Sequence, residues 1–264
     1  MICCSAQVAS VWEDPEKTLV KAEPFIMNAS CAGASLIAFP EQFATGWDPL
    51  SHDHVEECTG RTVSSLQNLA RRYSIAIIGS FRERFNSSPR NTAIAIGKDG
   101  KILAMYAKMH LFSPAGEDTA YTPGTTLPAF SLEGIKCGMA ICYDLRFPTL
   151  FRIYARQGVQ AVFVPSAWPE SRIRHWELFL SARAAENQMY VIGINTTGTN
   201  PIDQYPGASM TADPYGTLVN RAGNREELLF SELDPSLVDT LRNEFPIEND
   251  RKDALYHSLL MERG

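Results

Sequence analysis

Three residues with chemically useful side chains each stand at the end of a short apolar run in the sequence. Glu41 follows SLIAFP, Lys108 follows KILAMYA, and Cys142 ends IKCGMAIC. Runs of this length are typical of buried strands, so each side chain is expected where a strand ends. Taken alone, each residue is explained at least as well by packing in the core or by exposure to solvent as by a role in catalysis. Together, a carboxylate, an ammonium and a thiol provide a base, an electrostatic stabiliser and a nucleophile, which indicates cysteine-based catalysis.

The combination predicts how each group acts. A thiol has a pKa of about 8.5 and a nearby ammonium favours the thiolate, so Lys108 is expected to activate Cys142 and to bind developing negative charge. Glu41 is expected to take the thiol proton and later to activate water. A carboxyl does this near neutral pH only if partial burial raises its pKa. This chemistry requires no metal and no organic cofactor.

The elements that carry these residues alternate between strand-like and helix-like patterns. Apolar residues at three and four spacing predict helices over 14–31, 59–73, 149–157 and 175–188. Short apolar runs predict strands that begin at Ile2, Ser35, Ala76, Asn91, Lys101, Ile135, Ala161 and Tyr190. The Asp-Gly turn in GKDGK predicts a hairpin, so the sheets must be mixed. Pro24 lacks an N–H and is expected to kink the first helix or to start a new one.

Length and composition indicate one soluble globular unit. The chain has 264 residues, of which 45% are hydrophobic and 20% charged. No repeat or Gly/Ser linker divides it, so residues 1–264 are expected to form a single domain. From about residue 246 the sequence predicts a C-terminal arm, RKDALYHSLL, that packs on a partner.

The net charge and the cysteine spacing limit which kinds of partner and which cellular compartment are expected. The net charge of −6 repels phosphate backbones and anionic lipids, so a small-molecule substrate is expected, with neither nucleic acid nor membrane as a partner. The opening MICCSAQVASVWEDPEK lacks the basic region of a signal peptide, which favours a cytoplasmic location. The 6 cysteines lack paired metal-type spacing, and most are expected to be reduced and buried.

The sequence resembles the nitrilase superfamily of carbon–nitrogen hydrolases at these same stretches. FPEQFATGW resembles the glutamate motif of that family, YAKMHLF its lysine motif and CYDLRFP its cysteine motif. The resemblance implies a four-layer α-β-β-α sandwich, of class α/β with mixed sheets. It also implies Glu41 as general base, Lys108 as oxyanion stabiliser and Cys142 as nucleophile. SPAGEDTAYTPG resembles the segment with a second glutamate, so Glu117 is implied to hold Lys108 and the substrate amide in line.

The resemblance extends to the type of bond cleaved. CYDLRFP is similar to the amidase-like branches, whereas nitrilases usually carry a Trp-Glu pair after the nucleophile. The stretch SAWPESRIRHWELFLSARAAENQMYVIGIN resembles bacterial omega-amidases, which release ammonia from the terminal amide of 2-oxo dicarboxylic acid monoamides. The expected alternatives within the superfamily are N-carbamoyl amino acid hydrolysis and nitrile hydrolysis. Thr149 departs from the family pattern, which often has glutamate there, and this departure is expected to affect helix packing more than chemistry.

Several residues near the motifs are candidates for substrate contact. The backbone N–H of Tyr143 is expected to bind the oxyanion beside Lys108, and Trp168 to wall the pocket. A guanidinium pairs bidentately with a carboxylate, which makes four arginines candidates for a substrate carboxylate: Arg146, Arg172, Arg174 and Arg183. Arg172 and Arg174 are favoured because they follow the loop after Trp168, whereas Arg183 is expected to make a structural ion pair.

Three other interpretations compete with a Glu-Lys-Cys site. A papain-like enzyme needs an imidazole beside Cys142, for which His110 and His175 are the candidates. A metal site would use His52–His54 with Cys58, although the spacing is weaker than that of known zinc sites. A non-catalytic binding protein on the same sandwich is expected to lose at least one charged partner. The resemblance also implies a homodimer or higher homo-oligomer, built on helices 147–157 and 175–188.

Overall fold

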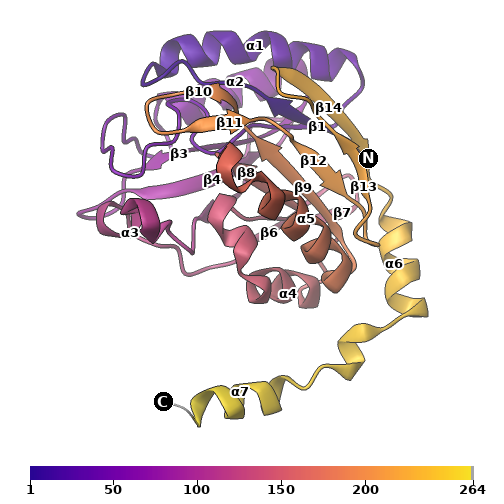
Figure 1. Cartoon of the computed structure of the whole chain (residues 1–264). Coiled ribbons are helices and arrows are strands. Elements are labelled where there is room, and N and C mark those ends of the chain that lie inside the picture. The colour runs from indigo at the N-terminus through magenta and orange to yellow at the C-terminus, as the bar shows by residue number, and fades with distance from the viewer. Residues whose placement is uncertain (263–264) are drawn as a thin grey trace.

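Two mixed sheets of six strands each face one another at the centre of the molecule, in a computed structural model that describes residues 1–262 (Figure 1). The first has the order β14-β1-β2-β3-β4-β5 and the second β13-β12-β9-β8-β7-β6, while β10 and β11 form a separate hairpin. The strands are β1 (Ile2–Gln7), β2 (Leu36–Ala38), β3 (Ala76–Glu83), β4 (Arg90–Ile96), β5 (Ile102–Ala107), β6 (Ala129–Leu132), β7 (Ile135–Met139), β8 (Ala161–Ser166), β9 (Tyr190–Asn195), β10 (Thr197–Thr199), β11 (Gln204–Pro206), β12 (Met210–Ala212), β13 (Leu218–Arg221) and β14 (Glu227–Glu232).

Helices cover the outer face of each sheet. The first sheet is covered by α1 (Pro15–Cys31) and α2 (Arg61–Tyr73), and the second by α4 (Pro148–Arg156) and α5 (Ile173–Asn187) (Figure 1). The predicted four-layer α-β-β-α sandwich is therefore confirmed, and its helices begin and end within a few residues of the predicted bounds. All eight predicted strands form. The strands that the prediction missed are β6 and those from β10 to β14.

Strand alternation places the two apolar layers. Ile37 of β2 and Ile77 of β3 point outward into the cluster beneath α1 and α2. Their neighbours Leu36, Ala38 and Ile78 point inward to the second sheet. Successive side chains of a strand point to opposite faces, so these fully apolar strands must be covered on both sides. The four layers follow from that requirement.

The predicted hairpin is confirmed, and one proline does not start a new helix. β4 and β5 pair antiparallel, and Gly97 N donates to Lys101 O over 2.8 Å across a turn whose Gly100 has φ 79°. Pro24 lies inside α1 and neither ends it nor starts a new helix. Pro24 is exposed, as is Val20 one turn earlier, so the carbonyl that loses its N–H partner faces water.

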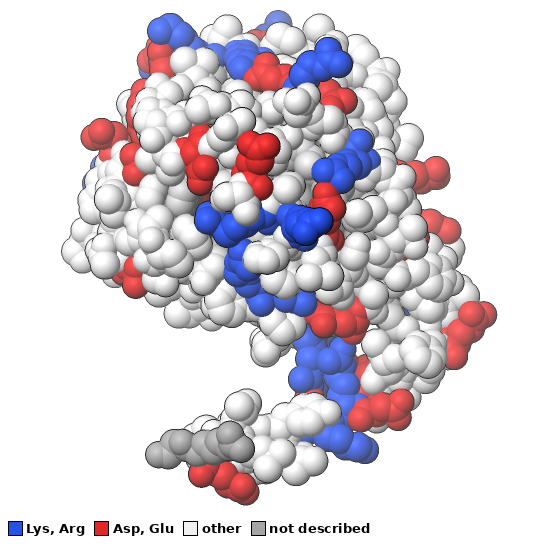
Figure 2. All heavy atoms as spheres, viewed as in Figure 1, with Lys and Arg blue, Asp and Glu red and all other residues white. Residues whose placement is uncertain are grey.

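The C-terminal segment leaves the body of the molecule. It comprises α6 (Pro235–Glu244), the 3-10 turn η4 (Ile247–Asp250) and α7 (Asp253–Met261), and Figure 1 shows α7 extending away below α4. Asp253 forms ion pairs with Arg152 and Arg156 of α4, the second over 2.8 Å. Acidic and basic side chains are mixed over the face shown in Figure 2, including where this segment leaves the body. None of the helices within residues 1–262 is both long and apolar enough to cross a membrane.

Candidate active site

The predicted charged and thiol residues meet at one edge of the sandwich. Glu41 follows β2, Lys108 follows β5 directly, and Cys142 opens the 3-10 turn η2 (Cys142–Arg146) just after β7. β2 and β5 belong to the first sheet and β7 to the second. In sheets with parallel strands, ligands bind outside the carboxyl ends of the strands, and these three residues all lie there.

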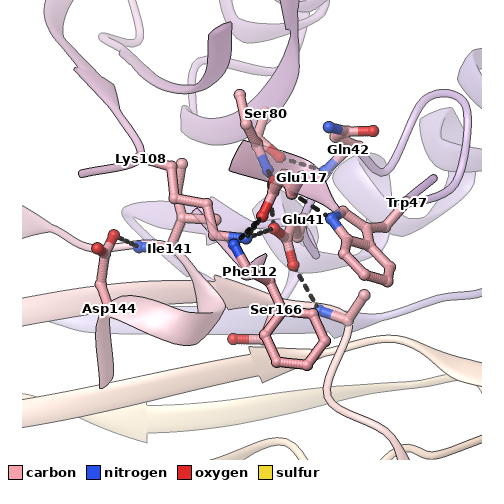
Figure 3. Close-up of polar contacts among 12 residues, drawn as sticks. Glu41, Gln42, Trp47, Ser80, Lys108, Phe112, Glu117, Ile141, Asp144 and Ser166 are labelled. Carbon is pink, nitrogen blue, oxygen red and sulfur yellow. Dashed lines mark hydrogen bonds and ion pairs between the residues drawn. The ribbon is translucent and has the colours of Figure 1, made fainter. Parts of the chain in front are cut away.

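A buried ion cluster forms the floor of this site. Lys108 Nζ lies 2.8 Å from Glu41 Oε1 and 2.7 Å from Glu117 Oε2, and all three side chains have an exposed fraction of 0% (Figure 3). Glu117 opens the short helix α3 (Glu117–Ala120). The structure therefore brings together Glu41, Lys108 and Glu117, from three separate stretches of the sequence.

Neutral donors satisfy the remaining carboxylate oxygens. Asn91 Nδ2 donates to both carboxylates, over 2.8 Å to Glu41 Oε1 and 3.0 Å to Glu117 Oε1. The backbone N–H of Phe112 donates to Glu117 Oε2 over 2.7 Å, and that of Ala167 donates to Glu41 Oε2 over 3.1 Å (Figure 3). Buried charges persist only when they are paired and hydrogen-bonded, and both conditions are met here.

The two carboxyl groups differ in how tightly they hold a proton. Burial raises the pKa of Glu41, and the charge of Glu117 adds to this effect while Lys108 opposes it. Burial alone would raise the pKa of Glu117, but the charge of Lys108 and the hydrogen bonds from Lys108, Phe112 and Asn91 together outweigh burial and lower that pKa. Burial would lower the pKa of Lys108, yet Glu117 and Glu41 together raise it. Lys108 therefore remains charged, Glu117 favours the ionised form, and Glu41 is the carboxyl that holds a proton more readily.

Cys142 sits on a tight strand-to-helix connection. Its φ is 44°, in the left-handed region that residues other than glycine rarely adopt. Burial, and next the charge of Glu41, raise the pKa of Cys142 well above its ordinary value, and Lys108 offsets only part of this. The ammonium of Lys108 thus favours the thiolate, as expected, but burial and the charge of Glu41 outweigh it. The resting group is a neutral thiol beside a carboxyl with a raised pKa, as a general-base mechanism requires.

Cys142 opens into a small cleft whose empty volume is about 380 Å³, counting space open to solvent. Aromatic and charged residues make up most of the lining, which consists of Trp47, Lys108, Phe112, Cys142, Tyr143, Arg146, Ala167, Trp168, Pro169, Arg172, Asp203 and Tyr205. The predicted substrate-contacting residues Tyr143, Trp168 and Arg172 are thus brought to one surface. Trp168 is buried and lies two residues after the end of β8.

The arginines divide into two pairs. The guanidinium of Arg172 lies 5.3 Å from the ring centre of Phe112, and that of Arg146 lies 4.9 Å from the ring centre of Trp168. Within residues 1–262 neither pairs with a carboxylate. The prediction for Arg174 is corrected: it is exposed on the first turn of α5 and is absent from the cleft lining. Arg183 makes the expected structural ion pair, over 3.0 Å to Glu186.

The papain-like and metal-site interpretations find no support in the described residues. His110 Nδ1 lies 2.8 Å from Asp144 and its ring stacks on Phe147 at 3.7 Å, so the imidazole is engaged away from the cleft lining. His175 is exposed, with Nδ1 3.4 Å from Arg146. His52 contacts the carbonyl of Ala120. In the described part of the chain, no three His, Cys, Asp or Glu side chains lie in a metal-binding arrangement.

Sequence reasoning missed Asn91 and Asp144. Asn91 stands at the start of a predicted strand, and a buried amide at that position was the available signal. Asp144 lies within CYDLRFP, two residues after Cys142, and the thiol was the side chain of that motif to which a catalytic role was assigned. Both act through residues distant in sequence, Asn91 on the two carboxylates and Asp144 on Tyr106 of β5.

Residues 4–243 match the model of the carbon-nitrogen hydrolase family, and the chain belongs to that family. It is 34% identical over 244 residues to the 2-oxoglutaramate amidase of Bacillus subtilis, covering 92% of this chain and 94% of that protein. It is 31% identical over 261 residues to omega-amidase NIT2 of Mus musculus, covering 95% and 94%. The predicted enzyme class, an amidase-like carbon–nitrogen hydrolase, is confirmed.

A solved structure extends the likeness to the fold of an amidase with a reactive cysteine. A glutamate-to-glutamine mutant of the amidase from Nesterenkonia sp. AN1 shares 27% sequence identity with this chain. The TM-score is 0.86, over 98% of this chain and 96% of that one. That protein carries the acetamide moiety of fluoroacetamide added covalently at its active-site cysteine.

Proposed function

We propose that this chain hydrolyses the terminal amide of a short linear amide acid, and that Glu41, Lys108 and Cys142 are its catalytic triad. The observation that carries the proposal is the position of Lys108, held by Glu41 and Glu117 in the same cleft that Cys142 lines. Such a cleft offers a proton acceptor, a fixed positive charge and a nucleophile to one acyl carbon. The single domain expected over residues 1–264 accommodates all of them.

The reaction proceeds by acyl transfer through a thioester. Glu41 takes the thiol proton as Cys142 Sγ attacks the amide carbon, and the carbonyl oxygen becomes an oxyanion. Lys108 and the backbone N–H of Tyr143 stabilise that oxyanion. When the tetrahedral intermediate collapses, the C–N bond breaks, Glu41 returns its proton to the nitrogen and ammonia leaves. Water, deprotonated by Glu41, then attacks the thioester and releases the carboxylic acid and the thiol.

Glu117 acts in this scheme as the permanent counter-charge. Its lowered pKa keeps it ionised, so it holds Lys108 charged and in place while Glu41 gains and loses its proton. Without a second carboxylate, protonation of Glu41 would leave the ammonium buried without a partner, at a cost of several kcal/mol.

Two arginines favour a substrate with a carboxylate at the end away from the amide. Arg172 and Arg146 line the cleft, are held against aromatic rings and make no ion pair within the described residues. A guanidinium in that situation is available for a bidentate contact. Relatives named 2-oxoglutaramate amidase and omega-amidase support the same substrate class. We place the amide at Cys142 and the carboxylate at Arg172.

Ammonia release from a panel of compounds tests this function. The panel contains 2-oxoglutaramate, glutamine, an N-carbamoyl amino acid and a nitrile, each given to the parent protein, Cys142→Ala and Cys137→Ala. Cys137 is a matched control because its thiol is buried in the core away from the cleft. Activity is expected on the omega-amide for the parent and Cys137→Ala, and none for Cys142→Ala. A preference for the carbamoyl compound or the nitrile would contradict the substrate assignment.

We further infer a homodimer in the cytoplasm. Helices α4 and α5 pack side by side and expose Ile153 and Leu178, with exposed fractions of 41% and 60%. From these exposed apolar side chains on two packed helices we infer a second copy as partner. The free state of all the cysteines fits a reducing compartment. Sedimentation analysis of the purified protein tests the dimer, and a monomer at micromolar concentration would exclude it.

A further inference from the structure

Asp144 is a fully buried carboxylate that lies two residues after Cys142. Its Oδ2 accepts hydrogen bonds from the N–H of Ile141 over 2.9 Å and from the hydroxyl of Tyr106 over 2.7 Å. Its Oδ1 accepts from the N–H of His110 over 2.9 Å, and His110 Nδ1 lies 2.8 Å from the same oxygen. Figure 3 shows Asp144 reaching the backbone nitrogen of Ile141.

These partners flank the two residues that must meet the substrate. Ile141 immediately precedes Cys142 on the second sheet. Tyr106 and His110 stand on either side of Lys108 on the first sheet, and the hydroxyl of Tyr106 also accepts from the N–H of Met109 over 3.2 Å. One carboxylate therefore joins the segment that carries the thiol to the segment that carries the ammonium.

The backbone at Cys142 needs such support. A left-handed conformation at a residue other than glycine costs of the order of 1–3 kcal/mol and persists only where surrounding contacts impose it. Besides its side-chain contact, Asp144 donates its own N–H to the carbonyl of Ile141 over 3.0 Å. The turn preceding the thiol is thus fixed by both the backbone and the side chain of Asp144.

The ring of His110 is fixed in turn. It stacks on Phe147 with ring centres 3.7 Å apart and planes 6° from parallel. Phe147 ends η2, the same turn that Cys142 opens. His110 therefore contacts the turn of Cys142 twice, through Asp144 and through Phe147, while its own backbone continues the segment of Lys108.

We propose that Asp144 is a positioning residue that sets the distance and orientation of Cys142 relative to Lys108. It acts through the backbone of Ile141 and His110 and does not itself contact the substrate. The proposal rests on the proposed catalytic roles of Cys142 and Lys108. Misplacing reacting groups by about 1 Å costs about 100-fold in rate, so a residue that fixes their separation has a measurable catalytic effect.

Asp144→Asn tests this role with little change in side-chain volume. The amide puts an NH₂ group against either the Ile141 and Tyr106 donors or the His110 donors, so one side of the link is lost. We expect kcat on the omega-amide to fall by about 10- to 100-fold with KM within about twofold. Alkylation of Cys142 by iodoacetamide, followed on its own peptide by mass spectrometry, should slow in parallel. Tyr106→Phe, which removes one hydrogen bond to Asp144 and the acceptor of the Met109 N–H, should give a smaller change in the same direction.

Val238→Ala is the control for simple destabilisation, because Val238 is buried in α6, outside the cleft lining. The proposal would be overturned if folded Asp144→Asn kept its kcat. It would also be overturned if Asp144→Asn and Val238→Ala had the same Tm and lost the same factor in kcat. If Asp144→Asn fails to fold, Tyr106→Phe is the deciding variant. A normal kcat and a normal rate of Cys142 alkylation in Tyr106→Phe would then overturn the proposal. Slower alkylation in a protein that hydrolyses none of the tested amides would reject the proposed function and leave the positioning role standing.

Discussion

The two sheets contribute opposite kinds of surface to the cleft. The first sheet supplies Glu41 and Lys108, whose charges are satisfied with Glu117 before any substrate arrives. The second sheet supplies Cys142, a neutral thiol on a backbone with φ 44°, and the aromatic side chain of Trp168. The charged side is therefore part of the stability of the protein, whereas the thiol side serves the reaction. Substitutions on the two sides should separate these effects.

Removing the nucleophile should give the largest loss of activity and the smallest loss of stability. Cys142→Ala eliminates the thioester route, so kcat/KM should fall by more than about 10⁴-fold. The alanine removes only a small, partly exposed side chain from the cleft, so Tm should change little. Ammonia release and thermal unfolding of the same preparation check both expectations. A drop in Tm comparable to that of a core cavity would contradict the division between the two sides.

Removing the ammonium should affect both properties. Lys108→Met keeps most of the volume but leaves Glu41 and Glu117 adjacent and buried without a counter-charge. Breaking a buried pair in this way costs about 3–5 kcal/mol in the free energy of unfolding. The loss of an oxyanion donor costs about 10²- to 10³-fold in kcat. Denaturant unfolding beside steady-state kinetics measures both, and a variant that loses activity with full stability would show that the carboxylates do not depend on Lys108.

The convergence of Glu41, Lys108 and Cys142 was predictable because each ends an apolar run, whereas Glu117 was expected from the family resemblance alone. Glu41, Lys108 and Cys142 could be identified without knowledge of long-range contacts. Asn91 and Asp144 could not, because an amide or carboxylate belongs to the site only when its hydrogen-bond partners on another strand lie beside it. The error at Arg174 has a local cause: α5 begins at Ile173, which packs inward, and one further residue turns about 100° away from the cleft. The pKa of Cys142 could not be read from residue types, because burial outweighs Lys108.

The pH dependence should distinguish the two carboxylates. Glu41 must be ionised to accept the thiol proton, so kcat/KM should rise with pH along a limb centred above the ordinary glutamate value of 4.5. Glu117 raises the pKa of Glu41, and Glu117→Gln should therefore move this limb to lower pH. Glu41→Gln should remove most activity, by about 10²- to 10⁴-fold, at every pH. A limb unmoved by Glu117→Gln would contradict the electrostatic coupling between Glu117 and Glu41.

The same shifts have consequences for stability, with opposite signs. Folded Glu41 holds its proton to higher pH than unfolded Glu41, so its contribution falls as pH rises from 4.5 through its raised pKa. Folded Glu117 has a lowered pKa, so its contribution is present above 4.5 and is lost as pH falls through its folded pKa. Unfolding free energies across acid pH should change slope in opposite directions in Glu41→Gln and Glu117→Gln. The same slope change in both variants would show that the two carboxyls are equivalent.

The smallest effect is expected on the thiol side, at the rim of the cleft. Arg172→Gln removes a guanidinium that lines the cleft, and KM for a carboxylate-bearing omega-amide should rise by about 10-fold, the loss of one charge-assisted contact, with kcat nearly unchanged. Arg174→Gln is the matched control, because Arg174 lies two residues further along the chain and is exposed outside the cleft. A neutral amide of equal length should lose nothing in either variant. If Arg172→Gln raised KM equally for the neutral and the charged amide, Arg172 would shape the wall of the cleft and would not recognise the carboxylate. If Arg174→Gln raised KM for the charged amide, the recognition site would lie on α5.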